Sequence, residues 1–381
     1  MFTSSTTSEP KIKSPIAPNS LKIITIQHSV TFGVQNESRQ SIARELNMKR
    51  AIFAIASLVL ALNVAQAQSL TGAGATFPYP IYSKWFTEYS AAHPGVQINY
   101  QSIGSGGGIK NFCSGLVDFG ASDMPMTNDL IAGCKNKLVH IPTVLGAVVP
   151  VYNVPGVSNV RFSGGLLADI YLGKVTNWND PAIAKDNPGV SLPNQKIIVV
   201  HRAEGSGTSF IFTDYLSKVS KEWAGGPGAS SAPGWPVGVA GKGNEGVAGL
   251  VRQVPGTIGY VELIYALQNH MTFGAVQNAA GNWITASIPG VTAAAASLKE
   301  MPADYRVSIT NAPGADSYPI SSFTYLLINL HPTDGAKEKV IRDMLSWIIK
   351  NGEGEVSALS YAPLPDNVAS KVLKTVYALP E

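Results

Sequence analysis

The sequence predicts an α/β fold in which helices cover both faces of the sheets. Segments with apolar side chains at helical spacing alternate along the chain with short strand-like segments. The strand-like segments 144–152 and 196–200 are rich in apolar side chains, as in sheets buried on both faces. A chain of 381 residues with 45% hydrophobic content can build a sizeable core, and its length suggests two or three domains.

The N-terminal part of the chain contains a pattern typical of secretion. Met48-Lys49-Arg50 precedes an apolar run over 51–64 and an A-x-A end at 65–67, so we predict a signal peptide over 48–67, cleaved after Ala67. A buried core helix would leave the basic flank and the A-x-A end unexplained. The run is too short to span a bilayer comfortably, and no Cys follows it to carry a lipid anchor. Residues 1–47 are predicted to be a non-native or disordered extension.

The region that follows is predicted to alternate between helix and strand. Apolar side chains at helical spacing after Pro80, which suits a first helical turn, indicate the first helix. The predicted elements are a helix over 80–89, a strand over 96–100, a turn over 104–108, a helix over 109–116 and a strand over 117–121.

The same alternation continues to the end of the chain. The predicted elements are strands over 144–152 and 196–200 and helices over 166–172, 210–219, 247–251, 338–350 and 366–377. Residues 225–238 are rich in Gly, Ser and Pro and are predicted to form a long surface loop without ligand chemistry of its own.

The charge of the exported part excludes some partners. The first 67 residues hold seven of the 28 Lys/Arg and three of the 25 Asp/Glu, so the remainder carries 21 basic and 22 acidic side chains, a net charge near −1. A near-neutral chain without a basic cluster has no electrostatic footprint for nucleic acid or an anionic membrane surface. Any anion that the protein binds must therefore be held by local groups.

Cys113 and Cys134 are the only cysteines. Export to an oxidising compartment favours a disulfide between them, and a pair of free buried thiols is the alternative. A zinc site would need four ligands, which these two residues do not provide.

Three small-residue turns indicate an anion site. The stretches GAGATFP (72–78), GSGGGIK (104–110) and GSGTSF (205–210) each lie where a helix is predicted to begin, and free N–H groups there favour an anion. The hydroxyls that they offer belong to Thr76, Ser105, Ser206 and Thr208. A capped helix after a tight turn explains any one of them. Together with Arg202, whose guanidinium suits bidentate contact with an oxyanion, they predict a composite site.

The known enzyme motifs fit poorly. No G-x-x-x-x-G-K-[ST] occurs, GAGATF lacks the third glycine of a dinucleotide fingerprint, and Ser206 lacks the outer glycines of G-x-S-x-G. The histidines at 140, 201, 270 and 331 show no ligand spacing. A catalytic triad need not be visible in a sequence, so an enzyme stays one alternative function, and a surface or adhesion module without a small ligand is another.

Eight stretches, taken in order, resemble the phosphate-binding proteins of bacterial high-affinity phosphate ABC transporters. They cover the exported part from end to end: LTGAGATFPYPIYSKW (70–85), NYQSIGSGGGIK (99–110), VDFGASDMPM (117–126), DIYLGKVTNWNDPAIAKDNPG (169–189), RAEGSGTSFIFTDYL (202–216), GKGNEGVAG (241–249), GTIGYVE (256–262) and YAPLPDNV (361–368). The resemblance implies a type II periplasmic binding protein, with mixed sheets flanked by helices in two lobes and a ligand cleft between the lobes. Residues 68–144 and 320–381 would form lobe 1, residues 145–319 would form lobe 2, and the lobes would close about a hinge.

The resemblance also implies the ligand groups. Lobe 1 would contribute Thr76, the backbone N–H of Phe77, Ser105 and Asp123, and lobe 2 would contribute Arg202, Ser206, Gly207 and Thr208. Two positions depart from the family pattern: Gly106 stands where a second serine is common, and Glu204 stands where an aspartate often pairs with the arginine. Glu204 is therefore expected to support Arg202.

Asp123 gives the expected site its selectivity. A carboxylate in an anion site is repulsive unless it accepts a proton from the ligand. Phosphate carries a proton at neutral pH and sulfate carries none, so Asp123 would favour phosphate.

The predicted function is therefore a periplasmic, non-catalytic solute-binding protein. It would capture inorganic phosphate and deliver the ion to the membrane permease of an ABC transporter. The alternative is a secreted phosphatase or other phosphoryl-handling hydrolase that uses the same anion site. We expect a monomer without cofactor, metal or catalytic residue.

Overall fold

The computed structural model describes residues 44–50 and 68–380. Residues 44–50 are helical and belong to a separate unit from the part that begins at Ala65. Most of the predicted signal peptide and of the extension before it lie outside the described residues. None of the helices within the described ranges is both long and apolar enough to cross a membrane.

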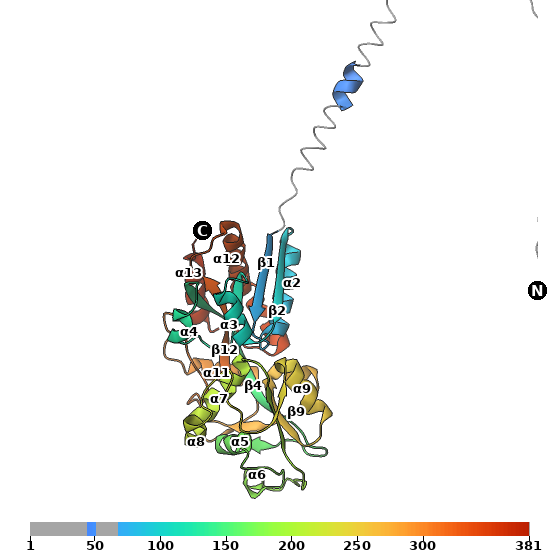
Figure 1. Cartoon of the computed structure of the whole chain (residues 1–381), viewed down its shortest axis with the longest axis vertical. Coiled ribbons are helices and arrows are strands. Elements are labelled where there is room, and N and C mark those ends of the chain that lie inside the picture. Colours follow the sequence, from blue (N-terminus) through green and yellow to red (C-terminus); the bar gives the residue numbers. More distant parts are fainter. Residues whose placement is uncertain (1–43, 51–67, 381) are drawn as a thin grey trace, which may run out of the picture. The chain divides into compact units, whose positions relative to one another are not determined.

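Residues 68–380 form the α/β fold, and the elements fall into two lobes (Figure 1). The first lobe is built from both ends of this region and holds the chain's C-terminus. Its elements are β1 (Gln68–Gly74), α2 (Tyr79–Ala92), β2 (Val96–Ser102), α3 (Ser105–Cys113), β3 (Phe119–Ser122), α4 (Asn128–Ala132), α12 (Gly335–Lys350), η1 (Gly352–Leu359) and α13 (Asp366–Tyr377).

The second lobe is built from the middle of the chain. Its helices are α5 (Gly164–Tyr171), α6 (Pro181–Asp186), α7 (Gly207–Val219), α8 (Lys221–Gly225), α9 (Gly243–Gln253), α10 (Leu263–Gln268) and α11 (Ile288–Ala296). Its strands are β5 (Arg161–Phe162), β6 (Ile198–Arg202), β7 (Val239–Gly241), β8 (Thr257–Glu262), β9 (Thr272–Phe273), β10 (Ala275–Gln277) and β11 (Trp283–Ile284).

One long strand, β4 (Leu138–Asn153), runs through both lobes. The large sheet has the order β2-β1-β3-β12-β4-β8-β6-β7, where β12 spans Ser321–Asn329. Up to Ala147, β4 pairs antiparallel with β12, and from Val148 onward it pairs antiparallel with β8. The change of partner lies close to residue 144, the expected end of the first segment of lobe 1. A continuous strand at this point keeps the two lobes in one hydrogen-bonded sheet.

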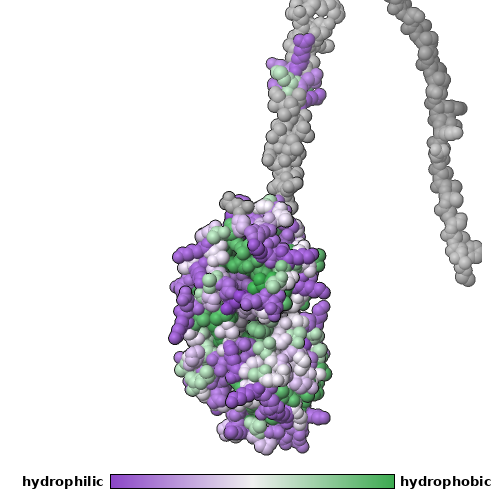
Figure 2. Space-filling model, turned by 60° about the vertical axis from the view of Figure 1, so that its left-hand side comes forward, coloured by the Kyte–Doolittle hydropathy of each residue, from purple (hydrophilic) through white to green (hydrophobic). Residues whose placement is uncertain are grey.

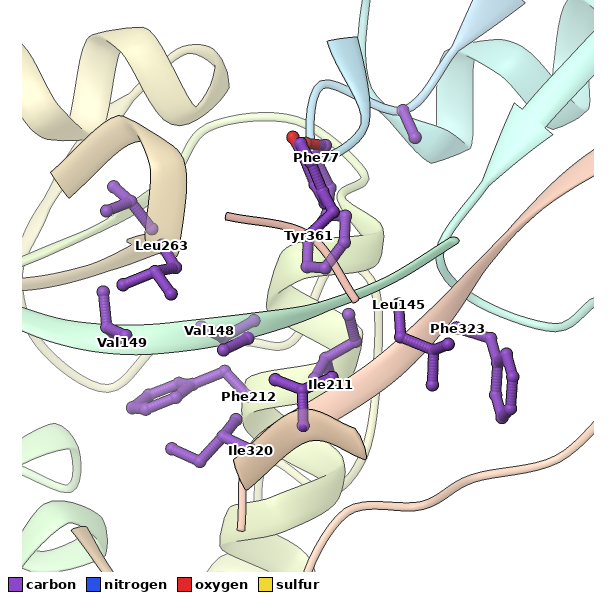
Figure 3. Close-up of a cluster of buried hydrophobic side chains, with 14 of the residues drawn as sticks. Phe77, Leu145, Val148, Val149, Ile211, Phe212, Leu263, Ile320, Phe323 and Tyr361 are labelled. Atoms are coloured by element: carbon purple, nitrogen blue, oxygen red, sulfur yellow. The ribbon is translucent and has the colours of Figure 1, made fainter. Parts of the chain in front are cut away.

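Apolar side chains fill the junction around β4. Figure 3 shows Leu145 and Val148 on β4, with Phe77 and Tyr361 on one side of the strand and Ile211 on the other. All five side chains are at most 1% exposed. The face of the unit shown in Figure 2 is largely hydrophilic, with smaller apolar patches, as expected for a chain that buries its apolar residues inside.

The structure corrects one predicted boundary. Residues 105–108 were predicted to lie in a turn, but α3 begins at Ser105 and includes this glycine run. The glycines permit close packing, because a Cβ on Gly108 would lie 2.5 Å from the Cα of Gly74 in β1. Within the described segment 104–108, only Gly104, with φ of 87°, has the positive φ that favours glycine in a turn.

The disulfide between Cys113 and Cys134 is confirmed. It joins the last residue of α3 to the segment after α4, so it closes a loop on the surface of the first lobe.

Candidate functional site

A buried polar cluster lies where the two lobes meet. Its members lie at or just before the starts of helices, or at the ends of strands. The start of a helix leaves backbone N–H groups without a partner inside the helix. Each side chain below is at most 3% exposed: Thr76, Ser105, Asp123, Arg202, Ser206, Thr208 and Asn244. The Gly207 N–H, from the second lobe, donates to Ser105 Oγ in the first lobe over 3.0 Å. Predicted residues from both lobes therefore meet.

The starts of three helices converge on this cluster. Thr76 lies just before α2, Ser105 is the first residue of α3, and Ser206 is the N-cap of α7, where its Oγ accepts from the Ser209 N–H. Free N–H groups and the positive end of the dipole at each start favour a negative charge. The start of α9 lies here too, because the Gly243 N–H donates to Glu204 and the Asn244 side chain contacts Thr76.

Arg202 brings a buried positive charge to the end of β6. Its Nε donates to Glu204 Oε1 over 3.1 Å, its Nη2 forms an ion pair with the same carboxylate, and its Nη1 donates to Thr208 Oγ1 over 3.2 Å. A guanidinium has five N–H donors, so these contacts leave donors for a ligand. Glu204 is itself fixed by the Gly243 N–H at 3.1 Å. The carboxylate thus holds the plane of the guanidinium.

Asp123 follows β3 and is 1% exposed. Its Oδ1 accepts from Thr324 Oγ1 over 2.7 Å, and its backbone N–H donates to Ser105 Oγ over 3.2 Å. Burial raises the pKa of Asp123 to about 7, although Thr324, Arg202 and Ser105 each favour the charged form. The side chain can therefore exchange a proton near neutral pH.

Gly207 allows the lobes to approach at Asp123. A Cβ at this position would lie 2.5 Å from both Asp123 Oδ2 and Ser105 Oγ. Only glycine fits there without a shift of these groups. The absence of a side chain lets the Gly207 N–H, at the start of α7, come within hydrogen-bond distance of Ser105 Oγ.

Sequence reasoning missed three residues of the cluster. Asn244 on α9 donates to Thr76 Oγ1 over 2.8 Å, Thr324 on β12 donates to Asp123, and the Tyr265 hydroxyl donates to the Thr76 carbonyl over 2.6 Å. The stretch GKGNEGVAG is also a glycine turn that opens a helix, so the signal used for the other three turns could have found Asn244. Thr324 sits in a strand without such a signal, and its place follows only from the pairing of β12 with β3 and β4.

The surroundings of Ser206 do not resemble a catalytic centre. Its Oγ accepts from a backbone N–H, and the nearby His201 ring stacks on Trp235 at 5.0 Å and bonds through Nδ1 to the Arg202 carbonyl. Activation of a serine needs a base within hydrogen-bond reach. No group of three or more His, Cys, Asp and Glu side chains that could hold a metal occurs among residues 44–50 and 68–380.

The chain matches proteins of known family over most of its length. The profile of the PBP superfamily domain matches residues 62–349. The phosphate-binding protein PstS of Xylella fastidiosa (strain Temecula1) is 46% identical over 306 residues, which are 80% of this chain and 83% of that protein. The phosphate-binding protein PstS of Pasteurella multocida (strain Pm70) is 45% identical over 310 residues, 81% of this chain and 89% of that protein.

Solved structures agree with the fold. A high-affinity periplasmic phosphate-binding protein bound with phosphate superposes with a TM-score of 0.66 at 21% identity, covering 80% of this chain and 93% of that chain. A phosphate-binding protein from Stenotrophomonas maltophilia gives 0.61 at 20% identity, covering 81% and 93%. At such identities the likeness concerns the two-lobed fold alone. The identity with the PstS proteins goes further, and this chain belongs to the PBP superfamily and, within it, to the family of PstS phosphate-binding proteins.

Proposed function

We propose that this protein captures inorganic phosphate between its lobes and delivers the ion to the membrane permease of a phosphate ABC transporter. The observation that carries the proposal is Arg202, a buried cation held by Glu204 and surrounded by hydroxyl and N–H donors. Glu204 balances the charge of the guanidinium but leaves some of its five N–H donors without a partner among the described residues, and a bound oxyanion can accept from those donors. The relatives at 45–46% identity are named phosphate-binding proteins.

The proposed ligand groups come from both lobes. The first lobe contributes Thr76, the Phe77 N–H, Ser105 and Asp123, and the second contributes Arg202, Ser206, Gly207 and Thr208. In support, the Ser105 and Gly207 groups lie 3.0 Å apart and Asp123 lies against Gly207. Donors surround the anion, while Asp123 is the one group that accepts a proton from it. That acceptor distinguishes phosphate from sulfate, which has no proton to give.

The proposed lobes are residues 68–144 with 320–381, and residues 145–319. The change of partner along β4 supports the first boundary, and the start of β12 at Ser321 supports the second. Opening and closing would bend the chain near these two points.

We also propose that the protein acts in the periplasm after removal of residues 48–67. The basic, apolar and small-residue order of that segment supports export. The disulfide between Cys113 and Cys134 supports an oxidising compartment.

A thermal-shift series tests the proposal. The purified protein is heated with phosphate, arsenate, sulfate or molybdate, and we expect stabilisation by phosphate and its analogue arsenate only. A ligand that binds the native state alone at a thousand times its Kd stabilises that state by about 4 kcal/mol. Equal stabilisation by sulfate would contradict the selectivity, and no response to phosphate would contradict the function. Hydrolysis of a generic phosphomonoester by the same sample would favour the enzyme alternative.

A further inference from the structure

Asn244, the second residue of α9, links the lobes inside the polar cluster. Its side chain is fully buried. The amide Nδ2 lies 2.8 Å from Thr76 Oγ1 of the first lobe and 3.2 Å from Thr208 Oγ1 of the second. The amide oxygen Oδ1 lies 2.9 Å from the backbone nitrogen of Glu262. One side chain therefore contacts a hydroxyl from each lobe and is anchored to β8.

The chemistry of these partners fixes which way the amide faces. The Glu262 backbone N–H can only donate, so the Asn244 atom that it faces must be the oxygen. The amide nitrogen must then face the two threonine hydroxyls, and that nitrogen can only donate. Each hydroxyl oxygen accordingly accepts a hydrogen bond from Asn244.

This arrangement decides where the hydroxyl protons point. Thr208 Oγ1 accepts from Asn244 and also from Arg202 Nη1, and both of these groups lack an acceptor. Thr76 Oγ1 accepts from the Asn244 side chain and from the Asn244 backbone N–H at 3.4 Å. Neither hydroxyl can donate to these neighbours. The single proton of each is left for another acceptor, which an oxyanion between the lobes provides.

We propose that Asn244 is a positioning residue that commits the Thr76 and Thr208 hydroxyls, one from each lobe, to donate to the bound anion. This inference rests on the proposed function, because it concerns the same phosphate site. The two hydroxyls then match only phosphate oxygens without a proton. The phosphate proton is thereby directed to Asp123, the acceptor of the cluster. Asn244 thus acts on selectivity without a contact of its own with the ligand.

A double-mutant cycle separates this role from a merely structural one. Phosphate affinity is measured by calorimetry for the full protein, for Asn244→Ala, for Thr76→Val and Thr208→Val, and for Asn244→Ala combined with each. Asn244→Ala alone should weaken binding about tenfold to a hundredfold, the range for hydrogen bonds to a charged ligand. In either valine background the hydroxyl is already absent, so the same change should cost at least about threefold less.

Asn187→Ala is the matched control. Asn187 is a buried asparagine of the second lobe whose amide bonds only to backbone groups, at Arg161 and Ile183. Its loss should lower the melting temperature and leave phosphate affinity unchanged. If Asn244→Ala does not fold, Asn244→Ser keeps a small, neutral and polar side chain at this position, and the same cycle is run with that variant.

The outcomes are distinct. Equal loss of affinity in the wild-type and both valine backgrounds, or wild-type affinity in Asn244→Ala, would overturn the inference while the phosphate function stands. A wild-type protein that does not bind phosphate would overturn the proposed function itself. Reduced loss in the valine backgrounds supports the positioning role.

Discussion

The Thr324 hydroxyl donates to Oδ1 of Asp123 over 2.7 Å, which ties strand β12 to the buried acid of the polar cluster. The other carboxylate oxygen, Oδ2, lies beside Ser105 and Gly207. Thr324 thus occupies Oδ1, whereas Oδ2 accepts only a long hydrogen bond of 3.5 Å from Ser105 Oγ, and we propose that Oδ2 accepts the proton of the ligand. Asp123 is therefore positioned to accept a hydrogen bond from an anion that carries a proton.

Asp123→Asn should narrow the preference for phosphate over sulfate. An amide can donate to an unprotonated oxyanion, whereas the carboxylate repels it and needs a proton from the ligand. Calorimetric titration of both anions should show the phosphate-to-sulfate affinity ratio falling by about tenfold or more. A variant that rejects sulfate as fully as the wild type would refute this account of selectivity.

Arg202→Ala should weaken phosphate binding by about a hundredfold or more, because a charged and desolvated contact is lost. Arg252→Ala is the control, since Arg252 is exposed on α9 and bonds to Asn269 on the surface. Titration of the two variants should show a large loss for the first and wild-type affinity for the second. Unchanged affinity of Arg202→Ala would remove this residue from the site.

Gly207→Ala should impair phosphate binding through shape alone. The new methyl group would lie 2.5 Å from Asp123 Oδ2 and Ser105 Oγ, so the lobes could not approach as they do here. Gly249→Ala in α9 meets no atom within 4 Å and should raise the free energy of unfolding by up to about 1 kcal/mol. Denaturant unfolding and phosphate titration of both variants test the pair, and wild-type affinity of Gly207→Ala would contradict the close approach.

Glu353 should make the protein less stable as pH rises. Its Oε2 accepts from the Leu364 N–H, its Oε1 is buried without a hydrogen-bond partner among the described residues, and burial raises its pKa to about 8. The native state keeps this proton up to about pH 8, whereas the unfolded chain loses it near pH 4.5. The stabilisation is therefore complete below the lower value, falls between the two, and is lost above about pH 8.

Glu353→Gln should flatten this dependence, because the amide does not titrate. The free energy of unfolding measured between pH 5 and pH 8 should change by a few kcal/mol less than in the wild type. Glu300→Gln, at an exposed position, serves as the control and should keep the wild-type slope. If the free energy of unfolding depends on pH equally in Glu353→Gln and in the wild type, the Glu353 carboxyl is already ionised in the native state over this pH range.

Local patterns predicted most of the helices and the location of the polar cluster. Helix α13 spans 366–377, as the apolar spacing predicts, and the three glycine turns all lead into the site. Such features depend on neighbours within one or two turns of chain, so they are readable in the sequence. Periodicity did not reveal β1, because its glycines are set by close packing, of Gly72 against Phe119 and of Gly74 against Ala121, rather than by a strand pattern.

Features that depend on distant parts of the chain were harder to predict. Asn244 and Thr324 are ordinary polar residues until α9 and β12 place them beside Thr76 and Asp123. The glycine run at 105–108 was taken for a turn, because composition does not distinguish a glycine needed for φ from one needed for space. The pairing of Glu204 with Arg202 was expected from the resemblance, and the structure adds the Gly243 N–H that holds it.

The position of β12 in the sheet has a consequence for how the chain is made. Strand β12 lies between β3 and β4, although about 170 residues separate it from β4 along the chain. In a chain synthesised only as far as residue 320, β3 and β4 would lack the strand that pairs with both of them, and their backbone hydrogen-bonding groups would stay unpaired on that side. The first lobe therefore cannot complete its sheet until nearly the whole polypeptide has been synthesised.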